Sequence, residues 1–227
     1  MSKIIIVEGV GINDLSLCGP HYYWNAEKND SLAIPEYKMW YEMIRRTSSA
    51  KLKQSTPSVA NSQCCPAWLH RINFQKWYHS QKVYKDSSGK TLHLDKDILV
   101  EGNNIYGPDQ CALVPQYLNA SLRDIFNDSS KYDRLRWVNY KEKTEDMINE
   151  LNKPYNVKVS YLGKLLRGGS YRDEKEAHHV GQILKSESLE RLVLVYSKEK
   201  CFRQDVAQSI LLKAEHLKHC SSLGIIT

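Results

Sequence analysis

The sequence predicts an α+β protein, and three observations carry this prediction. Apolar residues recur at helical spacing in 35–46 and 65–81, apolar and polar residues alternate in 155–161, and turn residues such as Gly102-Asn103 and Gly168-Gly169 separate the segments. The 227 residues suit one large domain or two small ones. We expect a front module at residues 1–125, a charged helical linker at 126–152 and a back module at 153–227.

In the front part, residues 1–34 are expected to be irregular apart from one strand at Ile4–Val7. A helix follows at 35–46, then a Ser-, Lys- and Gln-rich loop over 47–63 and a second helix at 65–81. Large aromatic side chains recur at helical spacing in the second helix, which usually marks a core face. These side chains are Trp68, Phe74 and Trp77.

In the back part, residues 120–150 read as helical and charged. Residues 155–171 read as three short strands, with Tyr155, Val157, Val159 and Tyr161 on one face and Lys158 and Ser160 on the other. A helix follows, with Asp173 as its N-cap and an inward face. The residues expected on that face are Ala177, Val180, Ile183 and Leu184. A last amphipathic helix covers 202–220.

Composition and cysteine usage restrict the class of protein. Apolar residues make up 41% of the chain and the mean hydropathy is −0.54. No run approaches the roughly 18 apolar residues of a membrane span, and the apolar stretch near the amino terminus is too short for a secretory signal. The six cysteines form no Cys-x-x-Cys pair. We therefore expect a cytoplasmic protein with reduced thiols, no membrane partner and no zinc site.

Positive charge is concentrated in two blocks. The net charge is +6, and the segment from Lys153 to Arg172 holds five basic residues and no acidic one. The segment from Pro35 to Lys90 holds ten Lys or Arg and three acidic residues. Solvated protein faces would explain either block. Two separate basic blocks that are both rich in aromatic residues favour nucleic acid as the partner.

Residues 91–119 predict a strand–strand–helix layout. Leu92–Leu94 is expected to pair with Cys111–Val114, and Pro115 then begins a helix, where its missing N–H costs nothing. This layout brings Asp95 or Asp97 towards Asn119 in the first turn of the helix. Carboxylate and amide oxygens suit Mg²⁺, with Mn²⁺ as the alternative. His93 is the only histidine in the stretch and is the candidate general base.

A plainer interpretation of the same residues stays open. Two aspartates at a strand end often form a solvated turn, and an asparagine often binds the local backbone. On this interpretation Lys96 is only a neighbour of Asp95 and Asp97. On the catalytic interpretation Lys96 is a candidate phosphate contact.

Four segments together resemble a family of phage-encoded HNH-like homing endonucleases. They are GVGINDLSL (9–17), PEYKMWYEMIRR (35–46), CCPAWLHRINFQKW (64–77) and HLDKDILVEGNNIYGPDQCALVPQYLN (93–119). The resemblance implies a His-Me finger, a ββα-metal nuclease that binds one divalent metal. It implies metal-ligand positions at Asp95, Asp97 and Asn119. Asp95 stands where the family has its base histidine, and His93 lies two residues earlier.

The back part resembles the Apetala-two-like DNA-binding domain that often follows such nucleases. The resemblance covers residues 153–196 and rests on KPYNVKVSYLGKLLRGGSYRDEKEAHHV (153–180). It implies a three-stranded antiparallel sheet, backed by one helix, that enters the DNA major groove. The basic side chains expected to contact DNA are Lys158, Lys164, Arg167 and Arg172.

These expectations describe a phage endonuclease that hydrolyses double-stranded DNA with a divalent metal in the host bacterial cytoplasm. One alternative is a phage DNA-binding protein that keeps the fold without the catalysis. Another is a phage protein that binds a host defence or polymerase component. The sequence leaves open whether the protein forms a homo-oligomer, and steeply salt-dependent DNA binding would separate the DNA readings from the last alternative.

Overall fold

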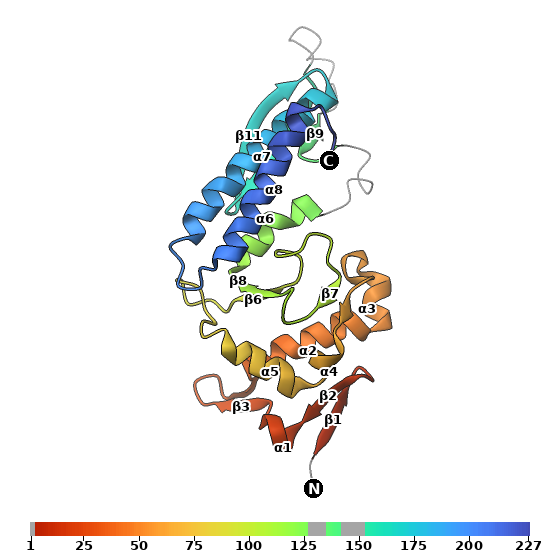
Figure 1. Ribbon diagram of the computed structural model, residues 1–227, viewed down its shortest axis with the longest axis vertical. Coiled ribbons are helices and arrows are strands. Elements are labelled where there is room, and N and C mark those ends of the chain that lie inside the picture. The colour runs from red at the N-terminus through yellow and green to blue at the C-terminus, as the bar shows by residue number, and fades with distance from the viewer. Residues whose placement is uncertain (1–2, 127–134, 142–152) are drawn as a thin grey trace. The chain divides into compact units, whose positions relative to one another are not determined.

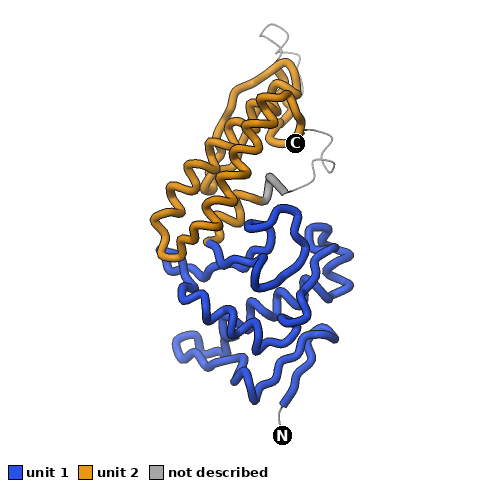
Figure 2. The backbone as a smooth tube through the Cα atoms, viewed as in Figure 1, with its two compact units in different colours: residues 1–114 blue, residues 115–227 orange. Residues whose placement is uncertain are grey.

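The computed structural model describes residues 3–126, 135–141 and 153–227, and it divides into two compact units. The first unit is Met1–Val114 and the second is Pro115–Thr227, coloured separately in Figure 2. Helices accompany small sheets in both units, so the predicted α+β class is confirmed. The division falls eleven residues before residue 125, where we expected the front module to end.

The start of the first unit is more regular than predicted. It contains two β-hairpins and one helical turn, and the expected strand is the first strand of the first hairpin. The elements are β1 (Ile4–Val7), β2 (Gly11–Asp14), α1 (Leu15–Cys18), β3 (Tyr22–Asn25) and β4 (Asp30–Ala33). Both pairs are antiparallel. Turn residues with positive φ, Glu8 and Gly9 in the first hairpin and Asn29 in the second, let the chain reverse. The prediction that residues 1–34 are irregular is therefore wrong outside Ile4–Val7.

The helices of the first unit follow the predicted order with two differences. They are α2 (Pro35–Ser48), α3 (Ala50–Ser55), the 3₁₀ turn η1 (Pro57–Val59), α4 (Pro66–Leu69) and α5 (Arg71–Ser80). The segment 47–63 was expected to be a loop but contains α3. The helix expected at 65–81 is two helices, because His70 has an extended backbone between them.

The predicted aromatic face forms the core of the first unit. Trp68 is 1% exposed and its ring lies 5.0 Å from that of Phe74 and 4.7 Å from that of Trp77. The indole of Trp40, from α2, donates a hydrogen bond of 2.7 Å to the carbonyl of Trp68. The aromatic spacing in residues 65–81 thus marks the surface on which α2 packs.

A buried ion pair also joins α2 to α5. Arg71 is fully buried and its Nη2 lies 3.1 Å from Glu36 Oε1, while its Nη1 donates to Asn13 Oδ1 at 3.1 Å. Two carbonyls, of Gly19 and Pro20, also accept from this guanidinium. The pair therefore ties both helices to the segment that contains the two amino-terminal hairpins.

Replacement of Glu36 by glutamine is expected to lower the free energy of unfolding by about 3–5 kcal/mol. The reason is that the change leaves the Arg71 charge buried without its counter-charge. Urea unfolding followed by tryptophan fluorescence measures the change. The control is Glu42→Gln, whose pair with Arg45 is about 40% exposed at both side chains and is worth about 0.5 kcal/mol or less. Equal effects of both variants would contradict a structural role for the buried pair.

The described residues of the second unit form a three-stranded antiparallel sheet and three helices (Figure 1). They are α6 (Gln116–Phe126), β9 (Val138–Tyr140), β10 (Tyr155–Tyr161), β11 (Lys164–Tyr171), α7 (Glu174–Tyr196) and α8 (Gln204–Ser222). β10 is the central strand, and α7 covers one face of the sheet and packs along α8.

A sheet of three strands was expected here, but its strands differ from the prediction. Residues 155–171 form two strands, because Gly168-Gly169 does not end β11. Instead the ladder bulges there, and a Cβ on Gly168 would come within 2.8 Å of the Val157 side chain. The third strand is β9, which lies in the segment expected to be a helical linker. The rest of that segment, 127–134 and 142–152, lies outside the described residues.

The sheet packs on α7 through a small apolar core. Val138, Val157 and Ala177 form its buried centre. Asp173 caps α7 as predicted, since its Oδ1 accepts from Glu176 N at 2.8 Å. Ala177 faces the sheet as predicted and Val180 and Leu184 are partly buried. Ile183 was expected to face inward but is 38% exposed.

His178 is a buried histidine whose contacts define its protonation state. Its Nδ1 lies 3.2 Å from the carbonyl of Arg136, and the Thr227 N–H donates to its Nε2 at 3.2 Å. The ring stacks on that of Trp137 at 5.7 Å. The hydrogen bonds therefore fit a neutral ring with its proton on Nδ1. Burial lowers the pKa of His178, an effect that the bond to Arg136 offsets in part.

We expect the protein to lose stability as the pH falls below about 6.5, the ordinary histidine pKa. His178 has a lowered pKa in the folded state, so the unfolded chain binds more protons in this range. Thermal unfolding at pH 7.5 and 5.5 measures this, and His178→Gln should lose a smaller share of its stability than the wild type. The exposed His219→Gln is the control. An unchanged pH dependence in His178→Gln would contradict this account.

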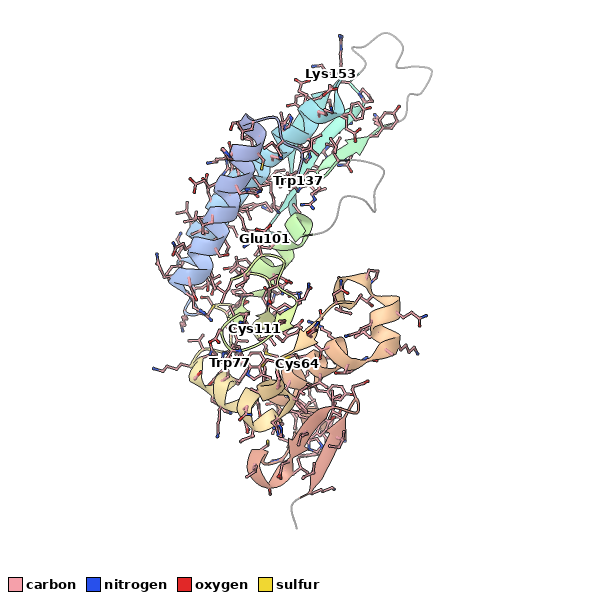
Figure 3. The ribbon with its side chains drawn as sticks, turned by 45° about the vertical axis from the view of Figure 1, so that its right-hand side comes forward. Cys64, Trp77, Glu101, Cys111, Trp137 and Lys153 are labelled. Atoms are coloured by element: carbon pink, nitrogen blue, oxygen red, sulfur yellow. The ribbon has the colours of Figure 1, made fainter. Side chains whose placement is uncertain are left out.

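The six cysteines are all free thiols. Figure 3 labels Cys64 and Cys111, both in the first unit. Burial raises the pKa of each of these two thiols to about 12. Both are therefore almost entirely protonated at neutral pH. Among the helices in the described ranges, 3–126, 135–141 and 153–227, none is long and apolar enough to span a membrane.

Candidate functional sites

The first candidate site is the strand pair that carries the predicted metal ligands. β6 (His93–Asp95) and β8 (Ala112–Val114) are antiparallel, with His93 opposite Val114 and Asp95 opposite Ala112. The predicted pairing is confirmed, with strand bounds that differ by one residue. Between them, β7 (Ile105–Tyr106) pairs in parallel with β5 (Gln63–Cys64). His93 and Asp95 lie two residues apart on one strand and so share a face of β6.

Asp95 is held by the backbone that follows it. Its Oδ1 accepts hydrogen bonds from Asp97 N at 2.8 Å and from Ile98 N at 2.7 Å. Burial raises the pKa of Asp95, although these two bonds act in the opposite direction. Both bonds fall on one oxygen, and in the described part of the chain Oδ2 accepts none. The carboxylate therefore shapes the turn through Oδ1.

Asp97 is paired with the lysine beside it. Lys96 Nζ lies 2.7 Å from Asp97 Oδ1 and 2.8 Å from the carbonyl oxygen of Asn103. The Lys96 residue is only 8% exposed. This geometry favours the plainer interpretation of Lys96, because its ammonium group is already occupied by two oxygen atoms.

Asn103 is a site residue that the sequence reasoning missed. Its Nδ2 donates to the carbonyls of Lys96 at 2.8 Å and Ile105 at 2.7 Å, and its Oδ1 accepts from Ile105 N at 3.0 Å. The amide thus ties the turn after β6 to the start of β7. In the sequence, the only signal for this residue is the Gly102-Asn103 dipeptide, which by itself predicts a turn.

Asn119, the third predicted ligand, lies in the second unit. It is in the first turn of α6, with its N–H 3.4 Å from the carbonyl of Pro115. In the described residues, no group of three or more His, Cys, Asp or Glu side chains is placed to hold a metal ion. Asp95 and Asp97 together offer two carboxylates, which suit a magnesium ion that keeps most of its water. Asp95 and Asp97 therefore match the predicted metal site in ligand type.

The second candidate site is the face of the sheet that α7 leaves uncovered. Val157 and Val159 point towards α7 and are buried, so their neighbours on β10 point the other way. The cross-strand register extends this outer face over the three strands. Its residues are Asn139 on β9, Asn156, Lys158 and Ser160 on β10, and Leu165, Arg167 and Ser170 on β11.

Among the described residues, the outer face carries positive charge and no negative charge. Lys158 lies directly opposite Arg167 in the register, and Arg167 is exposed. None of the three strands contains an Asp or Glu. Two basic residues facing one another without a carboxylate repel, which a sheet tolerates when a bound anion compensates. The pair is therefore a candidate anion contact.

The other predicted basic residues lie at the margins of this sheet. Lys164 begins β11 and Arg172 follows its last residue, and both are exposed. Lys153, labelled in Figure 3, precedes β10 and is also exposed. The structure thus places all four predicted DNA contacts of the back part on or beside one small sheet.

Comparisons of this chain with protein families, with curated proteins and with solved structures find no match in any of the three.

Proposed function

We propose that this protein binds double-stranded DNA through the outer face of the β9–β11 sheet. The observation that supports the proposal most strongly is the register pair Lys158–Arg167 on a sheet face that α7 does not cover and that carries no carboxylate. A phosphate backbone is the abundant polyanion that such a face suits. The major groove is about 12 Å wide and admits β-structure.

The dimensions of the sheet support the same proposal. Neighbouring strands lie about 4.8 Å apart, so the three strands span ~10 Å between the outer backbones. The seven residues of β10 extend ~23 Å at about 3.3 Å per residue. A surface of this width and length matches several base pairs of one groove.

Salt dependence of binding tests this proposal. Fluorescence anisotropy with a labelled 30-base-pair duplex, from 50 to 300 mM KCl, should give a straight plot of log affinity against log salt. A slope steeper than about −2 is expected if at least two phosphates are neutralised. Binding that does not respond to salt, or no binding, would refute DNA as the ligand and favour the host-protein alternative.

A second function, hydrolysis of DNA by the first unit, is favoured by the turn after β6. We propose that Asp95 and Asp97 hold a divalent metal, Mg²⁺ or Mn²⁺, through their Oδ2 atoms. When bound, such a metal polarises a phosphodiester and stabilises its leaving oxygen. His93, on the same face of β6 as Asp95, would accept the proton of the attacking water. The ligand role that the resemblance implies for Asn119 stays a prediction.

The contacts of Lys96 bear on this second function. A divalent metal at Asp97 would share the carboxylate with the ammonium of Lys96, which already lies 2.7 Å from Oδ1. The lysine thus fixes the carboxylate in position and lowers the negative charge that the metal meets. The alternative, a DNA-binding protein without catalysis, predicts that the turn after β6 is only structural.

A further inference from the structure

We infer that Asn139 and Asn156 read base identity in DNA and that adenine is the base they select. This inference rests on the proposed DNA binding by the sheet. It concerns a part of the outer face distinct from the basic pair, which we call the amide row. The amide row consists of Asn139, Asn156 and Ser170, which lie opposite one another on the three strands.

The amide row lies at one end of the outer face and the basic pair is next to it. Asn156 faces Asn139 on one side and Ser170 on the other, whereas Lys158, two residues further along β10, faces Arg167. The outer face is therefore divided into an uncharged polar part and a cationic part. Phosphate contacts position a protein on DNA, and side chains that hydrogen-bond to base edges distinguish the bases.

Asn156 is held in one orientation. Its Oδ1 accepts from Ser170 Oγ at 2.7 Å, and its Nδ2 donates to the carbonyl of Pro154 at 3.2 Å. Each bond uses one of two available positions, because an amide oxygen has two lone pairs and an amide nitrogen two protons. Asn156 thus keeps one acceptor and one donor position, in an orientation that Ser170 and Pro154 determine.

Asn139 is exposed and, within the described part of the chain, its amide forms no hydrogen bond with another residue. A single asparagine amide can pair with adenine, because adenine presents an N7 acceptor and an N6 donor in the major groove. The two strands lie about 4.8 Å apart, and successive base pairs rise about 3.4 Å. The two amides therefore reach neighbouring base pairs.

Selection from a random duplex library tests the inference. The full-length protein is incubated with duplexes that contain 14 random base pairs, and the bound DNA is sequenced. Three proteins are compared: the wild type, the double variant Asn139→Ala, Asn156→Ala, and the control Gln208→Ala, which removes an exposed amide from α8. The wild type and the control should enrich a motif with adenine at one or two adjacent positions. The asparagine variant should lose about 5- to 150-fold preference at these positions, because a bidentate contact contributes 1–3 kcal/mol of discrimination.

Affinity for non-selected DNA distinguishes failure of this inference from failure of the proposed function. The asparagine variant should bind random duplex within about twofold of the wild type, with the same salt slope. If the wild type binds but enriches no adenine, or if the variant enriches the same motif as the wild type, the inference is overturned while DNA binding stands. If the wild type binds no duplex at all, the proposed function and the inference both fail.

Discussion

Replacement of both Lys158 and Arg167 by alanine is expected to weaken duplex binding by about 10- to 100-fold at 0.1 M salt. Each basic side chain that neutralises a phosphate contributes about 0.9 to the salt slope. The slope of log affinity against log salt should therefore become about 2 units shallower. The two residues are a register pair on the uncovered face of the sheet, so their truncation leaves the packing on α7 intact.

The matched control for this variant removes the same amount of charge from elsewhere in the second unit. Lys175 is in the first turn of α7 and Lys200 lies between α7 and α8. Both residues are exposed. Lys175→Ala, Lys200→Ala should lose only the small affinity that follows from net charge. If the control lost as much affinity as the sheet variant, binding would depend on overall charge and not on the sheet.

Replacement of both Asp95 and Asp97 by asparagine is expected to abolish metal-dependent cleavage of DNA. Loss of residues that merely support metal ligands costs about 10- to 100-fold, and loss of the ligands themselves should cost at least 100-fold. Asparagine keeps an oxygen at the Oδ1 position, so the bonds from Asp97 N and Ile98 N can remain. The turn after β6 can therefore keep these two bonds, but Lys96, which is 8% exposed, loses its counter-charge. Thermal unfolding of the variant is therefore compared with that of the wild type.

Two measurements check this prediction. Conversion of supercoiled plasmid to relaxed or linear product is followed with Mg²⁺, with Mn²⁺ and with a chelator. Titration calorimetry with Mn²⁺ reports metal binding independently of cleavage. The control variant is Glu101→Ala, Asp109→Ala, which removes two exposed acidic residues from the same unit. If the asparagine variant still cleaves DNA with metal, the metal site does not include Asp95 and Asp97. If the wild type does not cleave DNA, the result favours a non-catalytic DNA-binding protein.

Features that depend on local pattern were predictable from the sequence. The pairing of residues around Leu94 with those around Leu113 follows from two short apolar segments, and Pro115 marks the start of the next helix. The N-cap at Asp173 and the aromatic cluster around Trp68 follow from capping chemistry and helical spacing in the same way.

Features that depend on contacts between distant segments were not predictable. β9 has only three residues, too few to show an alternating pattern, and it forms a strand because Val138 packs beside Val157. The sequence predicts a strand end at Gly168, whereas in the structure this glycine allows close packing against Val157. The surroundings of the candidate metal site were not predictable for the same reason. The contact of Lys96 with the Asn103 carbonyl depends on how the chain folds back after the turn.

Site-specific photo-crosslinking of the full-length protein to duplex DNA shows whether the β9–β11 sheet is the DNA-binding face. A photoreactive phenylalanine analogue at Ser160, on the outer face of β10, should crosslink to DNA, and the same group at Lys175, on α7, should not. Ser160 and Lys175 are both exposed, so accessibility alone predicts equal yields. Crosslinks from position 160 that disappear at high salt would support the sheet as the DNA-binding face. Crosslinks from position 175 and none from position 160 would contradict it.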